Sequence, residues 1–300
     1  MEILKNCPIC NSVEQAEFLT CIDHTQSKKE FTIVQCKSCG FKFTNPRPDT
    51  TEIGSYYKAE EYISHSDTTK GLMNRLYHLV RKYTLAKKLQ LAARLCGIPS
   101  TKNPKSLLDI GCGTGAFLKT CYDAGFKCLG IEPDADARRS AINNYKIDVR
   151  SESELNTLQI ESFDLITMWH VLEHIHDLNV RIIKIKELLK PNGRAIVAVP
   201  NCNSLDAKHY GNKWAAYDVP RHLYHFTPKD ITTLFEKHGM KVIETLPMRF
   251  DSFYVSMLSE KYKTGDVKYI QAIFQGILSN VSAIKSGLEF SSQIYIIKKM

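Results

Sequence analysis

Long apolar runs are missing from this chain of 300 residues. No stretch approaches the roughly 20 consecutive apolar residues that a membrane-spanning helix needs, so we expect no transmembrane segment. The segment from Met1 to Cys7 also lacks the apolar core of a signal peptide, and we therefore expect a cytoplasmic protein. Internal repeats and low-complexity tracts are absent as well. The composition, with 43% hydrophobic and 24% charged residues, is that of an ordinary globular protein with one large or two modest domains.

Disulfides are not expected in the cytoplasm, although the chain contains ten cysteines. Four of them form two CxxC pairs, Cys7 with Cys10 and Cys36 with Cys39, with 25 residues between the pairs. Each pair can form a tight knuckle, and four thiolates complete a tetrahedral shell around zinc. The spacing predicts a structural zinc site, and the alternative is two pairs of incidental cysteines.

The predicted zinc ribbon occupies residues 1–48. So short a segment buries little apolar core, and the metal would supply much of its folding free energy. Cys21 and His24 lie between the two pairs and are alternative ligands. The segment ends at Asn45-Pro46-Arg47-Pro48, because prolines of this density are typical of a linker.

Residues 49–104 are predicted to form a linker and a helical cap. A helical pattern runs from about residue 72 to 95, and no acidic residue occurs between Gly71 and Arg94. One face of this helix is basic and consists of Arg75, Arg81, Lys82, Lys87, Lys88 and Arg94. With the net charge of +8, that face could bind nucleic acid or phospholipid, and a solvated helix face is the simpler interpretation.

A buried strand, a glycine-rich loop and a helix follow one another between Ser106 and Asp123. The loop reads Asp109-Ile110-Gly111-Cys112-Gly113-Thr114-Gly115. Glycine lets a ligand approach the backbone, and the N-terminus of the following helix presents unpaired N–H groups to it. Seventeen residues after the loop, Glu132 ends a second predicted strand, where an acid suits the two hydroxyls of a ribose.

The GxGxG spacing differs from the GxGxxG of dinucleotide-binding proteins, and no Walker lysine follows it. The stretch resembles motif I of the class I S-adenosylmethionine (SAM)-dependent methyltransferases, and Glu132 stands where their ribose-binding acid stands. The resemblance implies a cofactor site made of Asp109, Gly111, Cys112, Gly113, Gly115 and Glu132.

Strands and helices alternate from Ser106 onward, which predicts a parallel sheet with helices on both faces. We expect strands near 106–110, 127–132, 146–149, 163–168, 194–200, 241–247 and 292–298. We expect helices near 115–124, 134–143, 178–190 and 228–238. Together with the resemblance, the pattern predicts an α/β, Rossmann-like methyltransferase fold over residues 105–300, with a mostly parallel seven-stranded sheet.

The segment after the strand at 163–168 contains the HxxEH pattern of zinc peptidases, from His170 to His174. That pattern needs both histidines on one face of a helix, whereas His170 directly follows a strand. The segment instead resembles motif IV of the methyltransferases. This places Trp169 and His170 beside the cofactor and leaves His174 to order the loop. Tyr57 is a further candidate cofactor contact, because aromatic faces attract the cationic sulfonium.

A loop of about 27 residues, 201–227, follows the fifth strand, and a loop of this length is usually functional. His222 and His225 lie in it among aromatic and charged residues. We predict that both converge with His170 beside the methyl group. One of the three is then the general base, and the loop pair is preferred.

The stretch 248–290 is predicted to be a helical insertion. It carries an apolar stripe at helical spacing, made of Ile270, Ile273, Phe274, Ile277, Leu278, Val281 and Ile284. Packing of this stripe on its own domain is expected, and contact with lipid or with a second subunit in a homodimer is the alternative.

The chain as a whole is similar to bacterial methyltransferases with an N-terminal zinc ribbon, and its core is similar to ubiquinone-biosynthesis O-methyltransferases. The resemblance predicts methyl transfer from SAM to a small molecule, at an oxygen of a sugar or phenol. The alternative is an RNA methyltransferase whose zinc ribbon and basic helix hold the nucleic acid. No NPPY or DPPY tetrapeptide follows the fourth strand, which argues against methylation of adenine or cytosine amino groups. A non-catalytic scaffold is a third interpretation, and the intact glycine loop argues against it.

Overall fold

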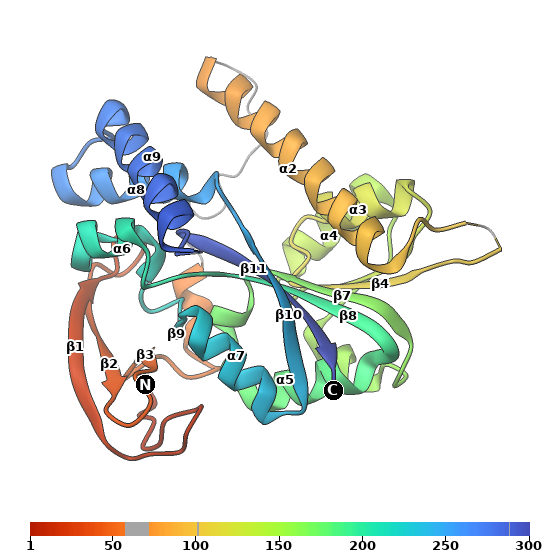
Figure 1. Cartoon of the computed structure of the whole chain (residues 1–300), viewed down its shortest axis with the longest axis horizontal. Coiled ribbons are helices and arrows are strands. Elements are labelled where there is room, and N and C mark those ends of the chain that lie inside the picture. The colour runs from red at the N-terminus through yellow and green to blue at the C-terminus, as the bar shows by residue number, and fades with distance from the viewer. Residues whose placement is uncertain (58–71, 101, 288) are drawn as a thin grey trace.

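A seven-stranded sheet forms the centre of the computed structural model, which describes residues 1–57, 72–100, 102–287 and 289–300, and side chains of the first long helix from residue 78 onward (Figure 1). The strand order is β10-β11-β8-β7-β4-β5-β6. The strands are β4 (Ser106–Ile110), β5 (Lys127–Ile131), β6 (Val149–Arg150), β7 (Phe163–Trp169), β8 (Leu189–Pro200), β10 (Met240–Pro247) and β11 (Ser292–Lys299). The five neighbouring strands β8, β7, β4, β5 and β6 are parallel to one another. Strand β11 runs antiparallel to both of its neighbours, β10 and β8. The predicted Rossmann-like fold with a mostly parallel seven-stranded sheet is confirmed.

Helices cover both faces of this sheet (Figure 1). One face carries α2 (Leu72–Cys96), α3 (Ala116–Asp123) and α4 (Ala135–Tyr145), and the other carries α5 (Leu178–Leu188) and α7 (Pro228–Lys237). The two faces are covered because alternate strand residues point to opposite sides. Leu107 packs in the core under α2 and α3, while Leu108 packs in the core with α5 and α7.

The boundary between α5 and β8 differs from the expectation. The helix ends at Leu188, and the strand begins at Leu189 instead of residue 194. Leu189 pairs with Phe163 of β7 ahead of a register shift, so the strand continues through the segment 191–193.

A second sheet joins the N-terminal segment to the loop after β8. Its order is β1-β2-β3-β9, with β1 (Gln15–Ile22), β2 (Glu30–Cys36), β3 (Lys42–Thr44) and β9 (Tyr224–His225), all paired antiparallel. Phe41 stacks on Tyr224 with ring centroids 5.8 Å apart. Phe41 also belongs to the same buried core as Leu108 of β4. The N-terminal sheet therefore packs on the central domain, and its fourth strand, β9, comes from the loop after β8.

Short helices connect these elements, and a helical hairpin fills the stretch 248–290. The connectors are η1 (Ile53–Tyr57), η2 (Glu152–Thr157), η3 (Leu172–His174), α6 (Leu205–Tyr210), η4 (Gly211–Lys213) and η5 (Ala215–Tyr217), and the hairpin consists of α8 (Asp251–Thr264) and α9 (Tyr269–Ser286). Among the described residues, no helix has the length and apolar character needed to cross a membrane. The cytoplasmic location stays a prediction.

The apolar stripe of α9 does not pack on its own domain, and the expectation that it does is wrong. All seven of its residues are exposed. The face that α9 buries consists of small and polar residues, including Ala272, Gly276 and Ser279.

Candidate active site

The glycine loop between β4 and α3 lies at the carboxyl end of the sheet, where β5 and β7 flank β4 on opposite sides. The N–H groups of Gly111 and Cys112 both donate to the carbonyl oxygen of Ile131, at 2.7 and 3.1 Å. A Cβ added to Gly111 would lie 2.4 Å from Cγ2 of Val171, whereas a Cβ on Gly113 would meet no atom within 4 Å. The open side of the loop is therefore at Gly113, which suits the approach of a ligand.

Glu132 is held against this loop by two backbone hydrogen bonds. Its Oε2 accepts from the N–H of Gly113 at 2.8 Å, and its Oε1 accepts from the N–H of Asp134 at 3.0 Å. The residue is only 8% exposed, and burial raises the pKa of its carboxyl group. The acid and the open glycine are thus adjacent, as a nucleoside site requires.

Asp109 lies beneath the loop, buried in the sheet. The hydroxyl of Thr167 on β7 donates to Asp109 Oδ1 at 2.6 Å. Burial raises the pKa of Asp109 to about 7, although the hydrogen bond and the charge of Lys88 oppose the shift. The carboxyl group therefore orders the strand ends that carry the loop.

Lys88 of α2 belongs to the site, although its place on the basic face predicted a solvated side chain. Its ammonium lies over the ring of Trp169, 4.1 Å from the centroid. Burial lowers the pKa of Lys88, and the negative charges of Asp109 and Asp251 partly oppose this shift. Lys88 is three residues after Leu85 and four before the buried Ala92, so helical spacing puts it on the inner face, and this was the signal available in the sequence.

Trp169 ends β7 beside this lysine. Its ring meets Phe117 of α3 edge-on, with centroids 5.5 Å apart. The indole Nε1 is buried and has no hydrogen-bond partner. A buried donor without a partner is costly, and an acceptor atom on a bound ligand would remove that cost.

His170, the next residue, is clamped between two carboxylates. Its backbone has φ of 58°, a left-handed conformation that non-glycine residues seldom adopt. Its Nδ1 lies 3.3 Å from Oε1 of Glu173, and its Nε2 lies 3.0 Å from Oδ2 of Asp251 on α8. Burial alone would lower the pKa of His170, but the hydrogen bonds and charges of the two acids raise it to about 10. The side chain is therefore an imidazolium at neutral pH.

Comparison with protein families finds a model described as a methyltransferase domain, which matches residues 77–245. The chain belongs to this methyltransferase family. The match includes the glycine loop, Glu132 and Trp169, and the strand order is that of the class I fold, so the protein is a class I SAM-dependent methyltransferase.

Individual relatives agree with this assignment at low identity. The methyltransferase is 26% identical over 176 residues to the ubiquinone biosynthesis O-methyltransferase of Bartonella tribocorum, covering 55% of this chain and 70% of the relative. It is 25% identical over 158 residues to the protein of the same name from Nitrobacter winogradskyi, covering 49% and 60%. The structure of magnesium protoporphyrin IX methyltransferase from Synechocystis, solved with bound SAH, superimposes with a TM-score of 0.56 at 13% identity. It covers 84% of this chain and 100% of that one, and at this identity the likeness shows the fold alone.

A second histidine cluster lies on the far side of Glu173. One carboxylate oxygen of Glu173 and one ring nitrogen each of His174 and His222 lie within 4.8 Å of one another. The rings of His174 and His222 meet edge-on with centroids 4.6 Å apart. Glu173 Oε2 is buried and has no hydrogen-bond partner. Two imidazoles and a carboxylate can hold a divalent cation or share a proton.

Backbone carbonyls lie against the Nδ1 atoms of these two histidines. His222 Nδ1 lies 2.8 Å from the carbonyl oxygen of Ala216, and His174 Nδ1 lies 3.0 Å from that of Arg221. A carbonyl only accepts, so Nδ1 of His222 carries a hydrogen, and in the neutral ring Nε2 is then the nitrogen with the lone pair. Burial and the nearby His222 lower the pKa of His174 to about 4, so its ring is neutral at neutral pH.

The structure does not bring His225 and Tyr57 into contact with His170. His225 is buried in β9, where its Nε2 lies 3.1 Å from the hydroxyl of Thr44 and its ring packs on Tyr217. Burial lowers its pKa well below the usual value. Tyr57 lies with its hydroxyl 2.9 Å from Nδ1 of His174. Both contacts order the loop around the second cluster.

A buried charge cluster ties the N-terminal sheet to the same loop. Arg221, only 1% exposed, donates to Asp23 Oδ1 at 3.0 Å and to both carboxylate oxygens of Asp218. Both partners keep Arg221 charged and raise its pKa against the effect of burial. Asp218 Oδ2 in turn lies 4.0 Å from His222 Nε2.

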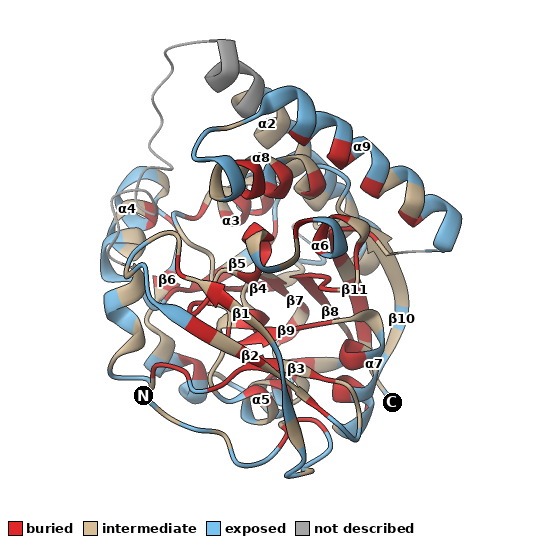
Figure 2. Ribbon diagram, turned by 90° about the vertical axis from the view of Figure 1, so that its left-hand side faces the viewer, coloured by how far each residue is buried: buried red, intermediate tan, exposed pale blue. Residues whose placement is uncertain are grey.

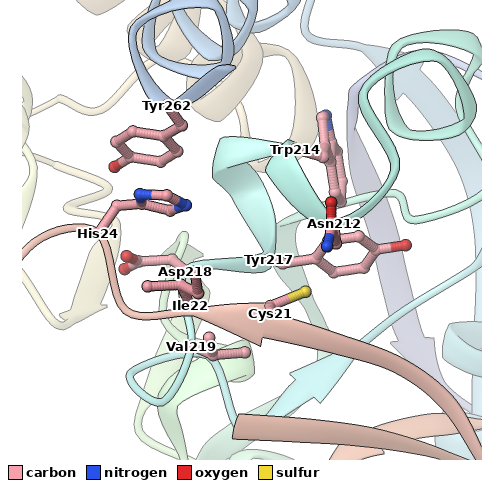
Figure 3. A pocket seen from close by; sticks show the side chains of 9 residues that line it. All are labelled: Cys21, Ile22, His24, Asn212, Trp214, Tyr217, Asp218, Val219 and Tyr262. Carbon is pink, nitrogen blue, oxygen red and sulfur yellow. The ribbon is translucent and has the colours of Figure 1, made fainter. Parts of the chain in front are cut away.

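A small pocket of about 10 Å³ lies beside Asp218, between β1, the loop after β8 and α8 (Figure 3). The residues that line it are Cys21, Ile22, His24, Asn212, Trp214, Tyr217, Asp218, Val219 and Tyr262. His24 stacks on Tyr262, with centroids 4.2 Å apart and planes at 11°, and its Nε2 is buried without a hydrogen-bond partner. Cys21 and His24 thus line a pocket and do not belong to the cysteine cluster, so their alternative role as zinc ligands is excluded.

The two CxxC pairs converge at one end of the N-terminal sheet. The Sγ atoms of Cys7 and Cys39 are 3.6 Å apart, and those of Cys10 and Cys36 are 3.5 Å apart. Tetrahedral zinc with bonds of about 2.3 Å separates its sulfur ligands by about 3.8 Å. The four thiols therefore have the arrangement that a structural zinc ion requires.

Proposed function

We propose that this methyltransferase transfers the methyl group of SAM to an oxygen of a small molecule, a sugar or a phenol. The observation that carries the proposal is the placement of His222, whose Nδ1 lies 2.8 Å from the Ala216 carbonyl oxygen and whose Nε2 lies 4.0 Å from Asp218 Oδ2. An oxygen nucleophile needs such a base at neutral pH, and the O-methyltransferase names of the relatives agree with this chemistry.

SAM would bind at the glycine loop and supply the methyl group and its thioether leaving group. Glu132 would bind the ribose hydroxyls, and Gly113 would let the ligand approach the backbone. The unpartnered Nε1 of Trp169 and the ammonium of Lys88 would bind acceptor atoms of the methionine portion.

Within the acceptor site, His222 would receive the proton of the acceptor hydroxyl at Nε2. Its Nδ1–H is held by the Ala216 carbonyl, which keeps Nε2 free for that proton. Asp218 is placed to stabilise the imidazolium that forms, since its carboxylate lies 4.0 Å away. His170 would remain charged throughout and fix the end of β7 against Asp251.

The acceptor ring would lie beside His222 and Asp218, outside the small aromatic pocket, which has room for about one water molecule (Figure 3). In that pocket Tyr262 and His24 stack on each other, and the buried Nε2 of His24 can bind one small polar group. The N-terminal sheet contributes to this pocket, and we propose that structural zinc at Cys7, Cys10, Cys36 and Cys39 holds that sheet in shape.

The test is a transfer assay from labelled SAM onto panels of phenols, nucleotide sugars and RNA. We expect a phenol or sugar product that is labelled on oxygen. On that substrate, His222→Ala should lower turnover by about 10²–10⁴-fold with unchanged SAM affinity, because a base acts on the acceptor. His209→Ala is the matched control, since His209 is an exposed histidine of the same loop. Near-normal turnover of the His222 variant would remove the base.

RNA methylation is the competing outcome of the same assay. The basic face of α2 supports it less than its sequence suggested. Lys88 lies on Trp169, Lys87 lies over Tyr83, and Arg94 forms two hydrogen bonds with Glu244. Labelled RNA, together with binding that weakens steeply with salt, would favour the RNA alternative.

A further inference from the structure

Helix α9 exposes its apolar side and buries its polar side. Figure 2 shows it at the rim of the molecule, with exposed residues along its outer side. The exposed fractions are Ile270 82%, Ile273 48%, Phe274 61%, Ile277 47%, Leu278 39%, Val281 43% and Ile284 62%. In the whole helix the only charged residue is Lys285, near its end. A helix face that stays in water normally carries several charges, so this one has the composition of a covered face.

The buried contacts of α9 prevent it from rolling its apolar side inward. A Cβ on Gly276 would lie 2.7 Å from the ring of Phe253 on α8, so only glycine allows this close approach. The hydroxyl of Ser279 donates to buried Asp206 at 2.6 Å. Rolling the helix would break both contacts and remove the hydrogen bond to Oδ1 of the buried Asp206, whose Oδ2 accepts from Trp214 and Ser291.

Five of the exposed residues form a seam with a strict 3.5-residue repeat. Ile270, Phe274, Ile277, Val281 and Ile284 are separated by four, three, four and three residues. This alternation is the a/d pattern with which one helix packs along another. Ile273 and Leu278 flank the seam and widen it. Insertion into lipid does not require such a repeat, because lipid tails have no register with the helix.

The area of this face is that of a protein interface. A fully exposed large side chain offers roughly 200 Å². The exposed fractions of the seven residues therefore correspond to apolar area on the order of 700 Å². The largest patch of a typical monomer covers about 300–600 Å². A stable complex buries about 800 Å² on each partner.

We propose that the occupant of this face is a second copy of the chain, with the two α9 helices packed antiparallel about a two-fold axis at Ile277. A two-fold interface uses the same patch on both copies, which is what a single self-complementary seam offers. Antiparallel packing also opposes the two helix dipoles. Ile270 of one copy then faces Ile284 of the other.

The first test is the mass of the full-length protein by sedimentation equilibrium, with and without Ile277→Glu. The wild-type chain should be a dimer, and Ile277→Glu should raise its dissociation constant at least 100-fold, because two carboxylates would meet on the axis. Val180→Glu is the matched control: it removes a comparably exposed apolar residue, 57% exposed, from α5. Unchanged SAM binding and circular dichroism establish that the variants are folded. The proposal is overturned if the wild-type chain is a monomer at 100 μM, about the highest concentration worth testing for a specific interface. It is also overturned if Ile277→Glu leaves the dissociation constant of the dimer unchanged.

The second test addresses the orientation of the helices. The double variant Ile270→Glu/Ile284→Lys should remain a dimer, since antiparallel packing pairs each carboxylate with an ammonium of the other copy. Ile270→Glu/Ile284→Glu should dissociate. If both double variants dissociate alike, the antiparallel arrangement is wrong. A monomer that binds anionic phosphatidylglycerol vesicles, and loses that binding with Ile277→Glu, would assign the face to lipid and overturn the second copy.

Discussion

At the scale of single residues, the environment assigns different roles to side chains of one type. His170 lies between the carboxylates of Glu173 and Asp251 and is charged, with a pKa raised to about 10. His174, four residues later, is neutral, because burial and His222 lower its pKa to about 4. Both residues are histidines of the same sequence motif. Only their neighbours in the structure make His170 a cation and His174 a neutral ring.

The open space at Gly113 leads to a cofactor-binding prediction. Gly113→Val should weaken SAM binding at least about 100-fold, or about 2.7 kcal/mol, by isothermal calorimetry, since its side chain would fill the approach to the loop. Gly265→Val is the control, because Gly265 also has positive φ and open surroundings, but lies at the end of α8. Equal SAM affinity in the two variants would contradict the assignment of the loop.

The neutral state of His174 predicts how stability depends on pH. Its folded pKa of about 4 lies below the unfolded value, so between pH 6.5 and 4 the unfolded chain binds a proton that the folded chain does not. Stability should therefore fall as the pH is lowered through this window. His174→Gln should reduce the slope of unfolding free energy against pH by up to about 1.4 kcal/mol per unit in urea titrations. An unchanged slope would show that His174 titrates normally.

His170 contributes with the opposite sign. Its raised pKa means that its stabilisation is complete below about pH 6.5 and is lost as the pH rises toward 10. His170→Asn should flatten the alkaline side of the stability profile in the same urea titrations, and His209→Asn, at an exposed site, should leave it as in the wild type. A steep alkaline loss that persists in the His170 variant would place its origin elsewhere.

At the scale of elements, the short strand β9 connects the N-terminal sheet, which carries the four-cysteine cluster, to the loop that carries the proposed base, His222. Its two residues pair with β3 of the N-terminal sheet, and His222 lies two residues before its start. The Thr44 hydroxyl donates to the carbonyl of His222 at 2.8 Å. The N-terminal sheet thus positions the proposed base, and its strand β1 lines the small pocket beside Asp218.

This connection predicts what loss of the metal does. Purified protein should contain close to one zinc per chain, and Cys36→Ser should release it and loosen the N-terminal sheet. The central sheet should stay folded with normal SAM affinity, while the acceptor KM rises and kcat falls, because β9 loses its partner strand. Cys96→Ser, a cysteine outside the tetrad, should change neither metal content nor kinetics. Zinc content that survives mutation of all four cysteines would exclude the site.

At the scale of the whole molecule, the two sheets share one core. Ile9 and Phe43 of the N-terminal segment belong to the same buried cluster as Ile110 and Met168 of the central sheet. The salt bridge from Asp23 to Arg221 adds a buried ion pair across the junction, and breaking such a pair costs several kcal/mol.

We therefore expect the metal-loaded protein to unfold as one cooperative unit. Differential scanning calorimetry should show a single transition, monitored equally by the N-terminal and central sheets. Arg221→Met should lower its midpoint, whereas Arg139→Met, in an exposed pair on α4, should leave it in place. Two separate transitions, of which a chelator moves only the first, would mean that the N-terminal sheet folds independently.

Much of this protein was determined by the sequence alone. The seven-stranded sheet, the glycine loop with Glu132 and the two CxxC pairs all follow from spacings within a few dozen residues, because strand alternation, turns and metal knuckles are local properties. The boundary of α5 and β8 was missed, since pairing with a distant strand decided it.

Only the tertiary structure decided the charge of His170, the contact of Lys88 with Trp169 and the outward side of α9. Each depends on a neighbour from a remote part of the chain: Asp251 for His170, Trp169 for Lys88, and Phe253 and Asp206 for α9. Helical periodicity identifies an apolar stripe, but it does not state which side meets protein. The fit of small residues against a neighbouring helix determined that side, and so left the apolar seam exposed.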